Sequence, residues 1–315
     1  MRPNPGLTIF LCLVLLVLVP VIYLKRGAFQ FQRPRSAIPV TLLLRDEGKL
    51  YHTDLENYLT GVVAAEMPAN FSLEALKAQA VAARTIAVNR LRRFGGRGCR
   101  HYLGADFCDD PAENQAWLPV SSLKAKWGAG KFQEYYLKIG QAIRQTSGII
   151  IVYQHKPIDA VFHSTCGVGT ADAREVWHHQ IPYLTSVDCG FDRQSPRYQN
   201  QVNYSWAELS QKLNLPAGSR LAIRITERSA RGRVIWIAVG QKLFSGEEFR
   251  RALSLSSTCF TWKVRQNGIV FHVIGNGHGV GMCQYGADGM AKEGWNYQQI
   301  LRHYYQGIQF AKIKE

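Results

Sequence analysis

Residues 54–93 read DLENYLTGVVAAEMPANFSLEALKAQAVAARTIAVNRLRR and predict two helices with a break between them. Asp54 is a good N-cap for the first helix, which should end at Met67 because a proline follows and disfavours helical geometry there. The second helix should begin near Ser72 and end at Gly95, after two arginines. Its predicted core face carries Leu76, Ala80, Ala83, Ala87 and Leu91.

A carboxylate interrupts the apolar stripe of the first helix, because Glu66 follows Leu55, Leu59 and Val62 in phase. Desolvation and the negative pole at a helix C-terminus both raise the pKa of such a carboxyl group. A carboxylic acid that keeps its proton near neutral pH can act as a general acid. The alternative is that Glu66 reaches solvent, or is neutralised by Lys77 or Arg84, which share one face of the second helix.

The same stretch resembles the stage II sporulation protein D family, which includes amidase enhancers. The family pattern YL-GVV-EMP, followed by EALKAQAVAART, is present at Tyr58–Leu59, Gly61–Val63, Glu66–Pro68 and Glu74–Thr85, and Ile86 replaces the usual tyrosine. The resemblance covers roughly residues 40–312. It implies that Glu66 is the catalytic glutamate and that Lys77 and Arg84 position a glycan or tune Glu66.

The 315 residues carry a formal net charge of +15 and a sequence pI near 9.6, which favours polyanionic partners. The basic residues are scattered, and no nucleic-acid-binding motif is present. We therefore expect no nucleic-acid partner, and a cell wall or a membrane surface instead.

The chain begins with an uncharged apolar segment, residues 6–24, which is just long enough to span a bilayer. No small-residue cleavage site follows it, so we predict an uncleaved anchor over 1–26, a juxtamembrane linker over 27–37 and a catalytic domain over 38–315. The basic residues after the anchor favour a cytoplasmic domain by the positive-inside rule. The resemblance implies the opposite, an extracytoplasmic domain on a bacterial cell membrane.

Cys99, His101 and Cys108 place three zinc-type ligands within ten residues. A structural zinc site needs four ligands. The resemblance implies a zinc site in this loop for some relatives, although Asn114 stands where they carry a second cysteine. The alternative is a disulfide or free thiols. We expect that no cofactor is required for the reaction, with a structural zinc as the candidate metal.

The segment FHSTCGVGT, residues 162–170, invites a nucleophile hypothesis with Ser164 or Cys166 beside His163. Neighbouring side chains on a strand point to opposite faces, so His163 is poorly placed to serve Ser164. The resemblance places His163 and Ser164 at a glycan groove instead. It also implies a disulfide between Cys166 and Cys189.

The segment GNGHGVGMCQYGA, residues 275–287, contains a G-x-G-x-G-x-G run that fits neither a dinucleotide-binding fingerprint nor a P-loop. Its glycines instead predict a tight loop that lets main chain approach a ligand and displays His278. The alternative is a structural turn that holds His278 by hydrogen bonds. The resemblance places His278, Gln284 and Tyr285 at the glycan groove.

The rest of the chain predicts an α+β fold rather than alternating β-α-β units. A helical half and a strand-rich half should flank a groove in one large domain, behind one N-terminal transmembrane helix. Predicted strands lie at 38–44, 48–51, 149–153, 158–162, 221–226, 234–239, 260–264 and 269–274, and further helices lie within 127–146 and at 204–213, 246–250 and 298–305.

Together with these expectations, the resemblance implies a peptidoglycan lytic transglycosylase that acts in sporulation, during engulfment. Its partners would be glycan strands, the membrane, a cell-wall amidase and other sporulation membrane proteins. One alternative is a non-catalytic glycan-binding enhancer of an amidase, and another is a zinc-dependent wall hydrolase that uses the Cys99–Cys108 loop.

Overall fold

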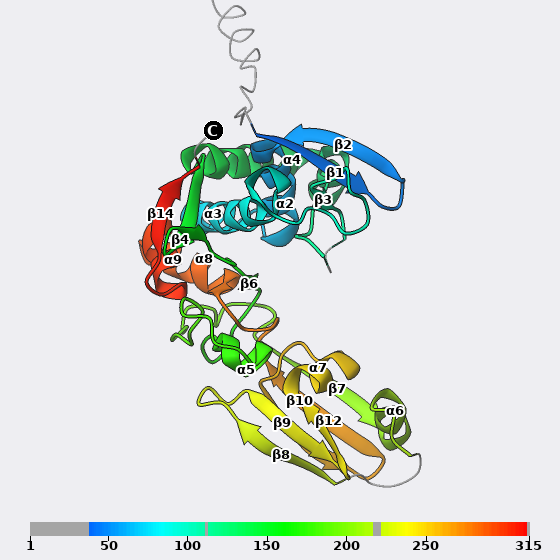
Figure 1. Ribbon diagram of the computed structural model, residues 1–315. Coiled ribbons are helices and arrows are strands. Elements are labelled where there is room, and N and C mark those ends of the chain that lie inside the picture. The colour runs from blue at the N-terminus through cyan, green and yellow to red at the C-terminus, as the bar shows by residue number, and fades with distance from the viewer. Residues whose placement is uncertain (1–37, 111–112, 217–221, 314–315) are drawn as a thin grey trace, which may run out of the picture. The chain divides into compact units, whose positions relative to one another are not determined.

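The computed structural model describes residues 38–110, 113–216 and 222–313, which belong to one compact unit. Helix α3 (Leu73–Arg90) lies at its centre and is buried on almost every side. It packs against α2 (Leu55–Glu66), α4 (Val120–Gln145), α8 (Gln284–Lys292), α9 (Tyr297–Tyr304) and β4 (Ile149–Tyr153) (Figure 1). Its many alanines allow these neighbours to approach closely, and all five residues of the predicted core face are buried.

The two predicted helices are confirmed, and one boundary differs. Asp54 caps α2 by accepting from the main-chain N–H of Asn57 at 3.0 Å, and Met67 is extended where the helix ends. Helix α3 ends at Arg90 rather than Gly95, because Leu91 is extended and turns its side chain into the core. The short 3₁₀ helix η1 (Arg92–Phe94) follows it.

The N-terminal hairpin is also confirmed, as β1 (Pro39–Leu44) paired antiparallel with β2 (Lys49–Asp54). Strand β3 (Phe107–Cys108) pairs parallel with β1. Helix α4 extends the predicted helix toward its N-terminus and kinks at Gly128, whose φ of 68° lies outside the helical region.

Two strands of only two residues each bring distant sequence motifs together. β6 (Phe162–His163) pairs parallel with β13 (Met282–Cys283). The strand predicted over 158–162 is mostly absent. Directly after β4, the chain pairs back with it only at β5 (Lys156–Pro157), and only residue 162 of the predicted range lies in a strand, β6. β4 pairs on its other side with β14 (Gln309–Lys312).

The segment between β6 and β13 contains α5 (Ala173–Trp177) and then two antiparallel sheets. One sheet has the order β11-β12-β7, and the other has the order β10-β9-β8 (Figure 1). Their bounds are β7 (Gln199–Ser205), β8 (Ile223–Arg228), β9 (Val234–Val239), β10 (Lys242–Ser245), β11 (Phe260–Arg265) and β12 (Gly268–Ile274).

A second hydrophobic core forms between these sheets and two helices, α6 (Trp206–Lys212) and α7 (Gly246–Ala252). Within this core, Phe249 stacks on Phe260, and Phe271 packs edge-on against both rings. The mixed α+β content of one domain is thus as predicted. The predicted anchor over residues 6–24 lies outside the described residues, and no helix within them is long and apolar enough to cross a membrane.

Candidate active site

A cleft of about 520 Å³ opens at the carboxyl end of α2. Five of the predicted site residues meet there, from the end of α2, the end of β6 and the start of α8. The cleft is lined by Ala65, Glu66, Met67, Pro68, Lys126, Phe162, His163, Ser164, Arg197, Gln284 and Tyr285. The strand pair β6–β13 therefore assembles the cleft from motifs that are far apart in sequence.

The carboxyl group of Glu66 is held by one hydrogen bond from the main chain. The N–H of Ala116 donates to Oε1 of Glu66 at 2.7 Å. Burial raises the pKa of Glu66, and this hydrogen bond lowers it by a smaller amount. No lysine, arginine or histidine of the described residues forms an ion pair with Glu66. This position therefore favours a carboxyl group that stays protonated at pH values where an exposed glutamate has already ionised.

Glu66 is also the only acidic side chain among the described residues that line the cleft. A hydrolase of the ordinary two-carboxylate type places a second Asp or Glu across the scissile bond. A single carboxyl group supports chemistry in which one residue acts first as acid and then as base.

The amide of Gln284 ties the start of α8 to the end of α2. Its Nε2 donates to the main-chain carbonyl of Glu66 at 3.1 Å and to Oε1 of Gln79 at 3.2 Å. Beside it, the N–H of Tyr285 donates to the carbonyl of Ser164 at 3.1 Å, and the Tyr285 ring packs edge-on against Phe71. These contacts fix the wall that faces the carboxyl group.

His163 is 4% exposed and lines the cleft as a neutral imidazole. Its Nδ1 lies 3.1 Å from the carbonyl of Val280, which can only accept, so Nδ1 carries the proton. Nε2 is left with a lone pair and no partner among the described residues. Burial, and then the neighbouring His278, lower the pKa of His163 well below its usual value.

His278 does not line the cleft but is fixed behind it. The N–H of Val280 donates to Nδ1 at 3.1 Å, so Nε2 carries the proton and donates to the carbonyl of Phe162 at 3.0 Å. Burial lowers the pKa of His278 to about 4. These bonds match the alternative in which His278 is held inside a structural turn. Its imidazole ring connects β6 to the glycine loop.

The glycine loop approaches protein main chain rather than an open ligand site. Gly281 has a φ of 70°, and a Cβ there would lie 2.2 Å from the carbonyl oxygen of Val161. Gly277 has a φ of 112° and would meet the Cβ of His163 at 2.7 Å. Glycine is needed at both positions because no larger residue fits between the loop and the strand that carries His163.

Two cationic residues of the cleft were not predicted. Nζ of Lys126, on α4, donates to the carbonyl of Ala64 at 3.0 Å, and burial lowers the pKa of this lysine. Arg197 reaches the cleft from a loop. Neither residue belongs to a recognisable motif, so only the packing of distant segments reveals them.

Comparisons with known proteins show the family to which the chain belongs. The family model SpoIID, described as stage II sporulation protein, matches residues 46–153, which contain Glu66. Stage II sporulation protein D of Bacillus subtilis (strain 168) is 39% identical over 289 residues, which is 91% of this chain and 82% of that protein. The chain belongs to the stage II sporulation protein D family.

Two further relatives define the breadth of this family. Stage II sporulation protein D of Bacillus amyloliquefaciens is 37% identical over 278 residues, covering 88% of this chain and 80% of that protein. A Bacillus subtilis (strain 168) protein named amidase enhancer is 27% identical over 307 residues, covering 79% of this chain and 39% of that protein.

Two residues that the family resemblance connected with the glycan lie elsewhere. Arg84 has no exposed surface and forms a two-pronged ion pair with Glu56, at 3.0 Å from Nε and 2.6 Å from Nη2. Lys77 pairs with Glu74 at 2.5 Å. Neither residue lines the cleft, so the geometry does not support a contact of Lys77 or Arg84 with a glycan there. Neither pairs with Glu66, so the geometry does not support the alternative in which they neutralise it.

The cysteine loop of this family member brings three candidate ligands together, with a histidine beside one of them. The sulfurs of Cys99 and Cys108 and a carboxylate oxygen of Glu113 all lie within 4.8 Å of one another. Nε2 of His101 lies 3.1 Å from Oε2 of the same Glu113. Glu113 is a candidate ligand that the sequence pattern did not indicate. The amide of its neighbour Asn114 donates to the Cys108 sulfur at 3.1 Å.

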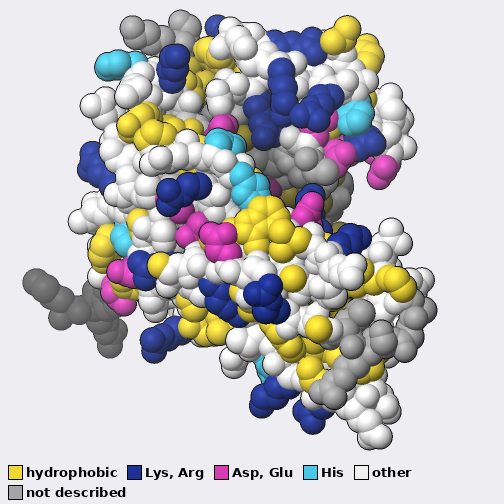
Figure 2. All heavy atoms as spheres, turned by 60° about the horizontal axis from the view of Figure 1, so that its bottom comes forward, with side chains coloured by type: hydrophobic (Ala, Val, Ile, Leu, Met, Phe, Trp, Pro, Cys, Tyr) yellow, Lys and Arg dark blue, Asp and Glu magenta, His cyan; other side chains and the backbone are white. Residues whose placement is uncertain are grey.

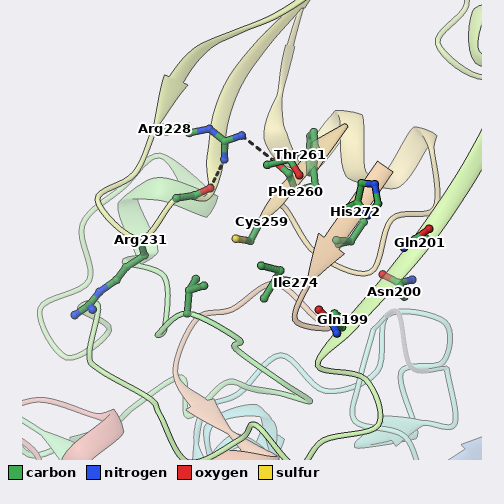
Figure 3. A pocket seen from close by; sticks show the side chains of 13 residues that line it. Gln199, Asn200, Gln201, Arg228, Arg231, Cys259, Phe260, Thr261, His272 and Ile274 are labelled. Carbon is green, nitrogen blue, oxygen red and sulfur yellow. Dashed lines mark hydrogen bonds between the residues drawn. The ribbon is translucent and has the colours of Figure 1, made fainter. Parts of the chain in front are cut away.

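A second cavity, of about 490 Å³, lies in the strand-rich segment and has a different chemistry (Figure 3). Gln199, Asn200 and Gln201 border it along β7, and Thr261 and His272 face it from β11 and β12. Its lining residues include arginines but no Asp or Glu. This cavity therefore offers no carboxyl group, and Glu66 in the first cleft remains the candidate acid.

Proposed function

We propose that this chain is a peptidoglycan lytic transglycosylase, which cleaves the bond between N-acetylmuramic acid and N-acetylglucosamine in glycan strands. The proposal rests mainly on the surroundings of the Glu66 carboxyl group. Its carboxyl group has a raised pKa, lacks a cationic partner among the described residues and is the only acid that those residues bring to the cleft.

In the first step, protonated Glu66 donates its proton to the glycosidic oxygen. The bond between this oxygen and C1 of the muramic acid breaks, and the glucosamine unit leaves with a free hydroxyl group. Positive charge develops at C1 and its ring oxygen, and the newly formed Glu66 carboxylate stabilises it.

In the second step, the 6-hydroxyl group of the same muramic acid attacks C1. Glu66 takes the hydroxyl proton and returns to its protonated form, and the sugar closes to a 1,6-anhydro product. No water is consumed, so one carboxyl group serves both steps and a second acid is not required.

The other cleft residues position the sugar ring in this proposal. The hydroxyl group of Ser164 offers a donor and the ring of Tyr285 an apolar surface, and His163, whose Nε2 is buried, completes the lining of the cleft. Gln284 acts as a positioning residue, because its amide holds the main chain that carries Glu66.

We place the reaction on the outer face of a bacterial cell membrane, in wall remodelling during sporulation. The net charge of +15 would retain the protein on an anionic wall. Figure 2 shows Lys and Arg side chains in several separate groups on the displayed face, as expected for diffuse attraction rather than one binding patch. An amidase that removes stem peptides is the partner expected beside it, together with the sporulation membrane proteins.

We also propose that the cysteine loop holds a structural zinc ion. Cys99, Cys108 and Glu113 supply three donors, and His101 lies beside them as the fourth. Bound there, the metal would stabilise the loop fold, and no step of the reaction uses it. In this proposal, the carboxylate of Glu113 replaces the cysteine ligand that relatives carry at the position of Asn114.

The test uses the full-length chain and glycan strands stripped of peptides, with products identified by mass spectrometry. We expect a 1,6-anhydromuramic product that is lost in Glu66→Gln. Glu175→Gln is the matched control, since burial also raises the pKa of Glu175 but this residue lies outside the cleft. A reducing-end product would instead indicate hydrolysis and overturn the proposal.

A non-catalytic amidase enhancer is the second candidate, supported by the relative of that name. It predicts that the unsubstituted chain forms no anhydro product on stripped strands or on intact wall. Stimulation of a purified amidase by both the unsubstituted chain and Glu66→Gln would then identify an enhancer.

A further inference from the structure

Three cysteines and one aspartate form a second ligand cluster, separate from the Cys99 loop. The sulfurs of Cys166, Cys189 and Cys283 and a carboxylate oxygen of Asp192 all lie within 4.8 Å of one another. The four residues come from the segment after β6, from the loop that follows α5 and from the start of α8. Each is buried, and Cys189 is the most exposed at 5%. All three thiols are free, so the disulfide predicted between Cys166 and Cys189 is not formed, although the two sulfurs are neighbours in this cluster.

Asp192 makes this cluster unusual, because its carboxyl group is fully buried and forms no ion pair among the described residues. Oδ2 accepts from the N–H of Gly167 at 2.8 Å and from the thiol of Cys166 at 3.2 Å. Oδ1 has no hydrogen-bond partner among the described residues, and no Lys, Arg or His there forms an ion pair with Asp192. Buried charges in proteins are paired or coordinate metals, so the geometry points to a missing positive charge.

We propose that Cys166, Cys189, Cys283 and Asp192 bind one Zn²⁺ ion. Three thiolates and one carboxylate supply the four donors of a tetrahedral structural site. With Zn–S bonds of about 2.3 Å, neighbouring sulfurs of such a site lie roughly 3.8 Å apart. The ligand atoms of the cluster, which all lie within 4.8 Å of one another, are close enough to reach that spacing around one ion. An iron–sulfur cluster does not fit, because its own iron and sulfide atoms would have to occupy the space between the cysteines.

The surroundings favour thiolates at these positions. Cys283 is the N-cap of α8, and its sulfur accepts from the N–H groups of Gly286 and Cys166, both at 3.3 Å. The hydroxyl group of Tyr304 lies 3.2 Å from the sulfur of Cys189. Such donors stabilise metal-bound thiolates from outside the coordination sphere and fix their orientation.

One buried cation stands beside the cluster. Arg233 is 1% exposed, and its Nη2 donates to the carbonyl of Cys166 at 2.9 Å and to that of Gly169 at 3.0 Å. Three thiolates and a carboxylate around Zn²⁺ carry a net negative charge, which this guanidinium would partly offset.

The position of the site indicates its role. Cys283 directly precedes Gln284, and Cys166 follows Ser164 by two residues, so two ligands adjoin residues that line the cleft. One metal ion would hold together the two segments that form the cleft wall facing Glu66 and the loop that carries Cys189 and Asp192. The proposed metal site stabilises the segments that support the cleft, so it does not depend on which reaction the cleft performs.

The experiment removes the other candidate site first. In the full-length chain carrying Cys99→Ser and Cys108→Ser, only the buried cluster retains several thiolates. Co²⁺ titrated into this metal-free variant is the probe, because thiolate-to-cobalt charge-transfer bands report how many thiolates bind. We expect one Co²⁺ per chain with an intensity typical of three thiolates, and its displacement by Zn²⁺.

Two substitutions and one control test the assignment. Cys166→Ser should remove one thiolate from the cobalt spectrum, and Asp192→Asn should weaken Co²⁺ binding at least about tenfold while keeping the side-chain volume. Cys259→Ser should change neither result, because Cys259 is equally buried but belongs to neither cluster.

A further measurement applies even if the variants do not fold. In the unsubstituted chain, Cys166, Cys189 and Cys283 should resist alkylation until a strong chelator is added, as mapped by mass spectrometry. A covalent Cys166–Cys189 peptide would overturn the proposal. So would alkylation that does not depend on the metal, or a metal content that the Cys99→Ser, Cys108→Ser variant loses completely.

Discussion

The amide of Gln284 donates to the main-chain carbonyl of Glu66 at 3.1 Å, across 218 positions of the sequence. This bond joins the first residue of α8 to the last residue of α2. The same nitrogen lies 3.2 Å from Oε1 of Gln79 on α3, so three helices share one buried side chain. The position of the candidate acid therefore depends on a residue that is far from it in sequence.

Gln284→Met should lower kcat of glycan cleavage by up to about 10²-fold, because small displacements of a catalytic group are costly. It removes the donor that fixes the Glu66 carbonyl, and it should move the alkaline limb of the pH profile, which unfolding alone would not do. Gln306→Met is the matched control, since Gln306 also donates to a main-chain carbonyl, that of His303. Equal losses in both variants would contradict a positioning role.

The pH profile of kcat/KM should fall on its alkaline side at the raised pKa of Glu66. Its protonated form starts the reaction, and burial raises this pKa above the ordinary value of 4.5. Activity should therefore persist above the range where an exposed glutamate has ionised, and decline as pH rises through the raised value. Rates at several pH values on stripped glycan strands measure this limb. A limb near 4.5 would show that Glu66 is not the desolvated acid.

His278 should make the protein less stable as pH falls below about 6.5. Its folded-state pKa of about 4 is lower than the unfolded value of 6.5, so the unfolded chain binds a proton first. The stability is complete above 6.5 and is lost progressively down to about 4, by about 3 kcal/mol in total. His163 acts in the same direction.

Urea unfolding of the unsubstituted chain and of His278→Gln between pH 4 and 7 measures this contribution. The variant should show a weaker pH dependence, while its free energy of unfolding should already be lower at pH 7 because two hydrogen bonds change. The exposed His155 supplies the control, and His155→Gln should keep the full pH dependence. Parallel curves for all three proteins would contradict the prediction.

Arg84→Met should destabilise the fold by about 3–5 kcal/mol, because it leaves the carboxylate of Glu56 buried and unpaired. Adding Glu56→Gln should recover part of this loss, since the uncompensated charge is removed. Thermal and urea unfolding measure both effects, and the activity per folded molecule should be unchanged. Reduced glycan affinity in a fully folded Arg84→Met variant would instead restore a binding role.

The local signals in the sequence determined much of the helical part. The N-cap at Asp54 and the proline after Met67 place Glu66 at a helix C-terminus, and helical periodicity alone marks it as a carboxyl group on a buried stripe. Alanine spacing predicts the core face of α3 correctly. These features depend on neighbours within one or two turns, which a sequence displays directly.

Tertiary structure decided the partners of each charged group. Lys77 and Arg84 lie on the predicted face of α3, yet Arg84 meets Glu56 and Lys77 meets Glu74, and neither reaches Glu66. The Cys166, Cys189, Asp192 and Cys283 cluster likewise gathers from three segments that have no common spacing. Side-chain pairing across the core depends on the packing of whole helices and loops. The sequence by itself therefore marks Glu66 as a candidate acid, and only the folded chain shows which side chains surround it.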